Sequence, residues 1–169
     1  MRSEATKDSQ TVTSDGRIAG MTTIAGVILR EGRNVLTRSG SLLEVYRQNW
    51  QEITIAPGQV NWVMLWPGGV TDWHRHADQT DHICAAMGVV KLCLYDERDG
   101  SPTRGVSNVL RIGALDPHLV IVPPGVWHGF RNETGEPAGF INYFGKPFRH
   151  EDPDNWRLPH DSPTIPCRL

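Results

Sequence analysis

The chain of 169 residues fits one domain, because a chain of this length can bury roughly two thirds of its unfolded surface in a single core. Its formal net charge of -2 creates no broad electrostatic field for nucleic acid or anionic lipid, so a small molecule is the expected partner, rather than a nucleic acid or a membrane. No apolar stretch reaches the length of a membrane span, and the first residues lack the apolar core of a signal peptide, so we expect a cytoplasmic protein.

Residues 1–20 are polar and lack any period, which predicts a flexible N-terminal arm ahead of a single domain over residues 21–169. Within that domain, short apolar runs alternate with turn formers such as Asp99-Gly100 and Pro123-Pro124-Gly125. From about residue 146, prolines interrupt charged residues and predict an irregular Pro-rich tail that packs over the domain. The apolar runs predict strands over residues 22–29, 42–47, 52–55, 60–66, 71–76, 82–87, 89–95, 108–112, 119–122 and 138–144.

The run 60–66 shows the alternation that a half-buried strand requires. Its two faces are Trp62, Met64 and Trp66 against Asn61, Val63 and Leu65. No segment of comparable length carries a helical period. Many short strands with frequent turns predict an all-β sandwich or barrel, for which the double-sheet jelly roll is the common closed form.

Four potential metal ligands have spacings that can bring them together: His74, His76, Asp81 and His128. His74 and His76 lie two apart on a predicted strand, so their side chains leave on the same face. Asp81 follows a polar stretch whose length suits a turn back to an antiparallel strand, and a turn before His128 would open another strand. Three imidazoles and one carboxylate suit iron, nickel, cobalt, manganese, copper or zinc and leave positions open for water or substrate. We therefore predict a divalent transition metal at these residues.

The same residues form two motifs that resemble those of the cupin superfamily. Gly68, His74-Arg75-His76, Asp81 and Gly88 resemble the first cupin motif, with Asp where Glu is usual. The segment Pro123-Pro124-Gly125-Val126-Trp127-His128, followed by Asn132, resembles the second motif. The resemblance implies a cupin double-stranded β-helix, a jelly-roll barrel with the metal inside it.

A narrower resemblance, from about Asn34 to Leu169, is to the dTDP-4-dehydrorhamnose 3,5-epimerase family and its relatives. It rests on Gly40 with Glu44, Gln59-Val60-Asn61, Asp96-Glu97-Arg98, Ser101-Pro102-Thr103 and His128-Gly129-Phe130. By this resemblance His74 takes the place of the catalytic base and Asp161 orients it. The family's catalytic tyrosine falls near Asn142, with Tyr143 its nearest substitute. The residues expected to line the substrate pocket are Glu44, Gln59 and Asn61.

The resemblance also concerns assembly, and two departures bear on the substrate and on the metal. In related cupins the first strand crosses to a partner subunit, which implies a homodimer.

Ser39 and Thr71 replace two arginines of the family, which argues against tight binding of a nucleotide diphosphate. His76 and Asp81 are residues that a metal requires and the family's epimerases do not. A coordinated imidazole nitrogen cannot accept a proton, so the sequence leaves open whether His74 is a ligand or a base.

The leading prediction is a metal-dependent enzyme of this branch that isomerises or epimerises a carbohydrate-like molecule, such as a sugar or a sugar nucleotide. The metal would act as a Lewis acid on a carbonyl or hydroxyl group. Three alternatives stay open: an iron(II) cupin dioxygenase, a non-catalytic sugar-binding cupin, and a working dTDP-4-dehydrorhamnose 3,5-epimerase.

Overall fold

The computed structural model describes residues 5–14 and 18–169, and all regular structure in these residues is β-strand. The parts of the predicted arm at residues 1–4 and 15–17 lie outside the described residues. The strands are β1 (Ile28–Glu31), β2 (Asn34–Thr37), β3 (Gly40–Leu43), β4 (Gln59–Leu65), β5 (Trp73–Arg75), β6 (Asp81–Met87), β7 (Val89–Asp96), β8 (Ser107–Gly113), β9 (His118–Val122), β10 (Val126–Arg131), β11 (Ala138–Phe144) and β12 (Trp156–Leu158). In the described part of the chain, no helix is long and apolar enough to cross a membrane.

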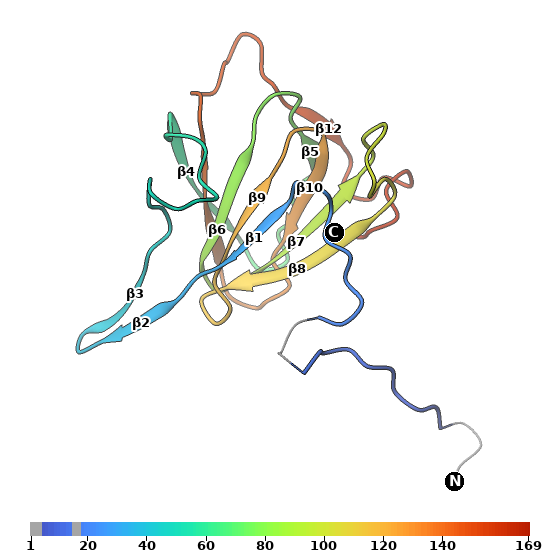
Figure 1. Cartoon of the computed structure of the whole chain (residues 1–169), viewed down its shortest axis with the longest axis horizontal. Coiled ribbons are helices and arrows are strands. Elements are labelled where there is room, and N and C mark those ends of the chain that lie inside the picture. The colour runs from blue at the N-terminus through green and yellow to red at the C-terminus, as the bar shows by residue number, and fades with distance from the viewer. Residues whose placement is uncertain (1–4, 15–17) are drawn as a thin grey trace.

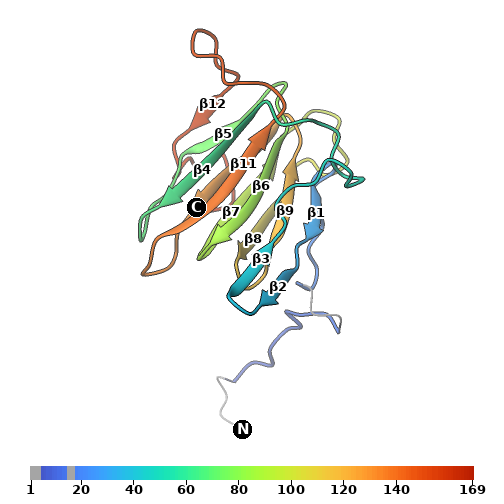
Figure 2. The same ribbon diagram turned by 90° about the vertical axis from the view of Figure 1, so that its left-hand side faces the viewer.

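Two antiparallel sheets face each other and form the barrel (Figure 1). The first sheet has the order β1-β9-β6-β11-β4, and Figure 2 shows it facing the viewer. The second sheet has the order β12-β5-β10-β7-β8. Strands β2 and β3 pair only with each other and form a hairpin that projects from the barrel. The prediction of an all-β double-sheet fold is confirmed.

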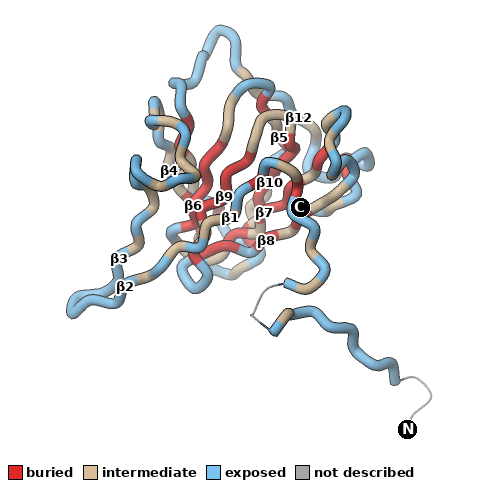
Figure 3. Tube along the Cα trace, viewed as in Figure 1, coloured by how far each residue is buried: buried red, intermediate tan, exposed pale blue. Residues whose placement is uncertain are grey.

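The main core lies between the two sheets, where the buried stretches of the tube in Figure 3 gather. Alternation along each strand sends every second side chain inward, so β-branched and aromatic residues from both sheets meet there. Ile83, Leu92, Val120, Phe130 and Phe140 are among the inward residues, and each is buried.

Chain outside the two sheets covers part of the outer face of each sheet. On the second sheet, Ile165 and Leu169 of the C-terminal tail pack against Trp73 and Trp127. Gly129 makes room for this tail, because a Cβ there would lie 2.5 Å from Leu169 Cδ1. On the first sheet, the segment 43–53 covers Cys84, Leu119, Ile121 and Tyr143. Residues 156–158 of this tail form the strand β12.

Most strand predictions agree with the structure to within two residues, including β4, β6, β7, β8, β9 and β11. The prediction of a strand over 52–55 is wrong, because this segment follows a turn closed by the bond from Ile53 N–H to the Trp50 carbonyl. The strand predicted over 22–29 begins only at Ile28, since side chains of the second sheet hold residues 22–25 instead of a strand ladder. Strands β2 and β12 have no counterpart among the predictions.

Candidate active site

The interior face of the second sheet carries two histidines directly opposite each other. His74 on β5 pairs in register with His128 on β10, and their ring centroids lie 4.1 Å apart. His76 follows β5 immediately, and its ring centroid lies 5.9 Å from that of His74 and 5.7 Å from that of His128. The two-residue spacing and the strand pairing thus gather three imidazoles at one end of the barrel interior.

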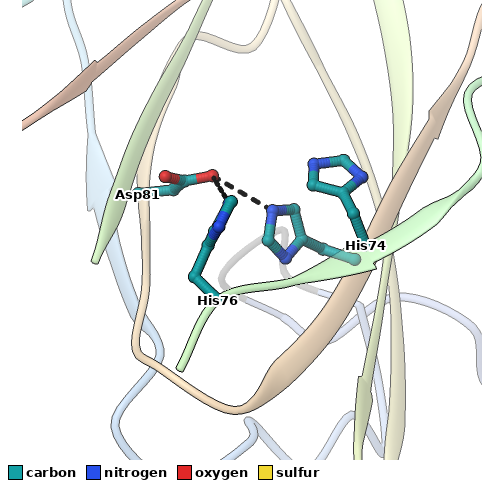
Figure 4. Close-up of side chains that lie close together, drawn as sticks. His74, His76 and Asp81 are labelled. Carbon is teal, nitrogen blue, oxygen red and sulfur yellow. Dashed lines mark hydrogen bonds and ion pairs between the residues drawn. The ribbon is translucent and has the colours of Figure 1, made fainter. Parts of the chain in front are cut away.

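Asp81, the first residue of β6, closes this cluster from the opposite sheet. Its Oδ2 lies 3.1 Å from His128 Nε2 and 3.3 Å from His76 Nε2. Figure 4 shows two dashed contacts that meet at one oxygen of the Asp81 carboxylate. Ligand atoms of all four residues lie within 4.8 Å of one another. The structure brings the four predicted ligands together, while the presence of an ion stays a prediction.

Backbone carbonyl groups orient each of the three imidazoles. His74 Nδ1 lies 3.2 Å from the Asp72 carbonyl oxygen, and His128 Nδ1 lies 3.1 Å from that of Val126. His76 Nδ1 bonds to the carbonyl oxygen of Asp154. A carbonyl only accepts hydrogen bonds, so each imidazole has a proton on Nδ1, and Nε2 is the nitrogen that can bind a metal once it carries no proton. Metal-binding histidines in proteins commonly have this arrangement.

Burial disfavours charge on the residues of the cluster, whereas the contacts between Asp81 and the histidines favour it. Burial, with the neighbouring His128, lowers the pKa of His74 to about 3, so His74 is neutral at pH 7. Burial also opposes a charge on His76, but hydrogen bonds and attraction to Asp81 outweigh it and raise the pKa of His76. Burial would raise the pKa of Asp81, yet the bonds from His128 and His76 hold it well below its usual value. Asp81 is therefore a carboxylate anion inside the barrel.

Two polar residues that sequence reasoning did not single out hold this cluster in place. The Asp154 carboxylate accepts bonds from the backbone N–H groups of Ala77, Asp78 and Gln79, at 2.6, 2.9 and 3.0 Å. These residues form the connection between His76 and Asp81. The Gln79 side chain donates a bond of 2.6 Å to Asp81 Oδ1, which leaves Oδ2 for the histidines. Asp154 lies in a tail without a motif, so no signal in the sequence pointed to it.

This donor set fits a divalent transition metal. Three imidazole nitrogens and one carboxylate oxygen are the ligands of borderline metals such as iron(II), nickel, cobalt and zinc. One ligand atom of each residue lies within 4.8 Å of the others, the carboxylate is ionised, and each imidazole is fixed through its Nδ1. No further protein ligand is needed, because catalytic sites of this kind keep positions for substrate or water.

Two predicted substrate residues, Gln59 and Asn61, lie on the inward face of β4. They alternate with exposed residues and continue the inward row of Val63 and Leu65. The Gln59 amide donates a 2.9 Å bond to Asn61 Oδ1, and Gln59 Oε1 accepts a 2.8 Å bond from Phe148 N–H. Both amides are therefore held in place by hydrogen bonds and face the same barrel interior as the histidines.

Three other predicted site residues lie away from the cluster. Tyr143 lies on the outer face of the first sheet, where its ring stacks on His82 at 4.9 Å. Asp161 is exposed, and His74 Nδ1 faces the Asp72 carbonyl rather than the Asp161 carboxylate. Glu44 borders a cavity of about 480 Å³ on the outer face, also lined by Arg30 and Trp50. None of these three residues belongs to the cluster in the barrel interior, and for Tyr143 the reason is that side chains alternate between the two faces of a strand.

The sequence and the fold were compared with known proteins. No family model matches the chain. The chain is 36% identical over 142 residues to the probable low-salt glycan biosynthesis epimerase Agl13 of Haloferax volcanii, covering 83% of this chain and 91% of that protein. It is 33% identical over 108 residues to the spore coat polysaccharide biosynthesis protein SpsL of Bacillus subtilis, covering 64% of this chain and 72% of that protein.

A solved structure extends this likeness to the three-dimensional fold. The dTDP sugar isomerase of Desulfovibrio desulfuricans G20 superposes with a TM-score of 0.80 at 29% identity, covering 85% of this chain and 90% of that one. The jelly-roll barrel, the motifs around the histidine cluster and the extent of the match to an epimerase agree with one another. The chain belongs to the dTDP-4-dehydrorhamnose 3,5-epimerase-like family of cupins, whose members are sugar epimerases and isomerases.

Proposed function

We propose that this protein is a metal-dependent epimerase or isomerase that acts on a nucleotide-linked sugar. The observation that carries the proposal is that three imidazole nitrogens and one carboxylate oxygen lie within 4.8 Å of one another in the barrel interior. The reaction and substrate classes are supported by relatives named as an epimerase and as a dTDP sugar isomerase. Because Ser39 and Thr71 replace two arginines, we expect the diphosphate of the nucleotide to be bound weakly.

A divalent metal held by His74, His76, Asp81 and His128 would supply a Lewis acid that polarises a sugar carbonyl or hydroxyl and acidifies the adjacent proton. The residues themselves contribute binding and orientation. Asp154 and Gln79 fix the positions of His76 and Asp81 through the bonds described above. Gln59 and Asn61 on β4 face the same interior and can hold polar groups of the sugar.

His74 decides between this proposal and a metal-independent reaction. Asp81 contacts His76 and His128, so His74 is the imidazole that can serve either as a fourth ligand or as a base. The two roles exclude each other because a coordinated nitrogen has no lone pair for a proton. An imidazole whose pKa is about 3 is a weak base at pH 7, whereas a neutral Nε2 is the form that binds a metal. We therefore assign His74 to the ligand set.

The experiment measures metal content and proton exchange on the same protein, purified without a histidine tag. A 4-keto dTDP-sugar is incubated in heavy water, and deuterium next to the carbonyl is followed by NMR. We expect exchange that stops after chelation and returns when the metal is restored. The His128→Ala protein should lose both the metal and the exchange.

The other outcomes separate the alternatives. Exchange that survives chelation and disappears only in the His74→Ala protein would establish His74 as the base of a metal-independent 3,5-epimerase. A bound metal without exchange would contradict the proposal, and oxygen consumption would then identify a dioxygenase. Sugar binding without metal or turnover would identify a binding module.

A further inference from the structure

Asn142, at the centre of β11, has a buried side-chain oxygen without a partner. Its Oδ1 is inaccessible to solvent and has no hydrogen-bond partner within the described residues. A buried acceptor without a partner is unfavourable, so such a group usually meets a partner in the functional state. The question is therefore what approaches Asn142.

The two neighbours of Asn142 show that its side chain points into the barrel. Ile141 and Tyr143 belong to the cluster on the outer face of the first sheet. Phe140, two residues before Asn142, belongs to the main core between the sheets. Since side chains alternate along a strand, Asn142 shares the inward face with Phe140.

Contacts across the barrel show at which level Asn142 lies. Phe140 stacks on Phe130 of β10, with ring centroids 4.1 Å apart. Two residues along β10, His128 contacts Asp81, which begins the strand beside β11. Asn142 pairs with Ile83 and its neighbour Tyr143 pairs with His82, so Asn142 lies two residues along β6 from Asp81. This places Asn142 between the level of Phe140 and the level of His128. It therefore lies above the aromatic floor, on the wall opposite His74 and His128.

A second carboxamide lies beside Asn142. Asn61 on β4 is its direct partner in the register, and Asn61 Oδ1 is already bonded to the Gln59 amide. The two asparagines, with Gln59, form a polar strip on the inner face, and the next inward residues are the apolar Val63, Leu65 and Phe140. Polar groups placed in this way give a mainly apolar site its orientation and specificity.

We infer that Asn142 is a specificity-determining residue whose Oδ1 accepts a hydrogen bond from a hydroxyl of the sugar, held between β11 and the histidine cluster. This inference rests on the proposed function, because it assumes a sugar at the cluster. A site built to bond a hydroxyl discriminates strongly against a ligand that lacks it, since the buried acceptor is then left unpaired. The nucleotide itself makes no contact with Asn142 in this arrangement.

The test compares the binding of dTDP with that of dTDP-glucose, measured by calorimetry on the full chain. We expect the wild-type protein to bind dTDP-glucose more tightly than dTDP. Asn142→Leu, which keeps the volume and removes the acceptor, should weaken dTDP-glucose binding about tenfold and leave dTDP binding unchanged. Asn142→Asp, which keeps an acceptor at this position, should retain more of the preference than Asn142→Leu. Asn49→Leu, at an exposed asparagine, is the matched control.

The results separate this inference from the proposed function. Unchanged affinities in Asn142→Leu, or an equal loss for both ligands with an unchanged melting temperature, would overturn the role of Asn142 alone. A wild-type protein that binds neither ligand would overturn the proposed substrate class and this inference together.

Discussion

At the scale of single residues, Asp154 links the C-terminal tail to the candidate metal site. Its carboxylate bonds to three backbone N–H groups between His76 and Asp81, and its carbonyl orients His76. Removing the carboxylate frees this connection and lets the ligands separate. We expect Asp154→Ala to lower metal affinity about ten- to a hundredfold, the scale of changes to residues that support metal ligands. Titration of the metal-free protein with cobalt(II), followed by absorbance, measures this.

Asp152→Ala is the control for this prediction, because Asp152 lies in the same tail but is exposed and pairs with Arg149 at the surface. Its cobalt affinity should equal that of the wild type. A cobalt affinity of the Asp154→Ala protein equal to that of the wild type would show that the chain between His76 and Asp81 keeps its conformation without this carboxylate.

The sequence predicted the four clustered residues because strand periodicity and turn length are local properties that a spacing records. His74 and His76 meet for this reason, and Asp81 returns beside them after a short turn. Asp154 was not predicted, because its role arises from contacts that the tail makes with the chain between His76 and Asp81. Tyr143 was predicted to belong to the site but lies on the outer face, because a shift of one residue along a strand moves a side chain to the opposite face.

At the scale of elements, the turn between β7 and β8 fastens the chain that precedes β1. Asp96 is fully buried, and its carboxylate accepts bonds from the side chains of Arg98, Ser101 and Thr103. Arg98 and Thr103 in turn bond to the carbonyl and the N–H of Ala25. The sequence linked this motif to the epimerase family, and the structure gives it a structural role.

We expect Asp96→Asn to lower the free energy of unfolding by about 3 kcal/mol at pH 7, because it leaves Arg98 without its buried partner. Burial opposes the charge, but the bonds from Arg98, Ser101 and Thr103 lower the pKa of Asp96 in the folded protein. Its contribution is therefore complete above the unfolded-state pKa of about 4 and is lost as the pH falls below that value.

Urea denaturation at several pH values tests both the size of this loss of stability and its dependence on pH. The difference between wild type and Asp96→Asn should be largest near pH 7 and shrink as the pH falls below about 4. Asp99→Asn is the control, since Asp99 is exposed in the same turn and pairs with Arg104 at the surface. A difference that stays constant with pH would contradict the assignment of the effect to the ionised carboxylate.

Strands with strong alternation or continuous apolar runs were predicted from the sequence almost residue by residue, as β4 and β11 show. The segment 52–55 was wrongly predicted because an apolar run that covers a sheet has the same composition as a strand within one. Strand β12 was missed because it exists through pairing with β5, a contact that its own three residues do not encode.

At the scale of the whole molecule, two apolar surfaces remain uncovered on the single chain. Strand β4 is at the edge of the first sheet, carries no charged residue, and exposes a row of large side chains: Val60, Trp62, Met64 and Trp66. The hairpin of β2 and β3 projects away from the barrel and exposes Val35, Leu36 and Leu42. Monomeric proteins usually protect such an edge with charges, prolines or bulges, and this one does not.

These surfaces lead us to expect a homodimer in which a second copy covers β4. A twofold axis would allow each chain to cover the partner's edge with the same surface, and tryptophan and methionine are enriched at the centres of such interfaces. Sedimentation at micromolar concentration should give the mass of a dimer. A Trp62→Glu, Met64→Glu double variant should be monomeric, because each charge would be buried without a partner. Leu115→Glu, at an exposed leucine in the β8–β9 turn, should remain dimeric. A monomeric wild type, or a double variant that still dimerises, would show that β4 is not the interface.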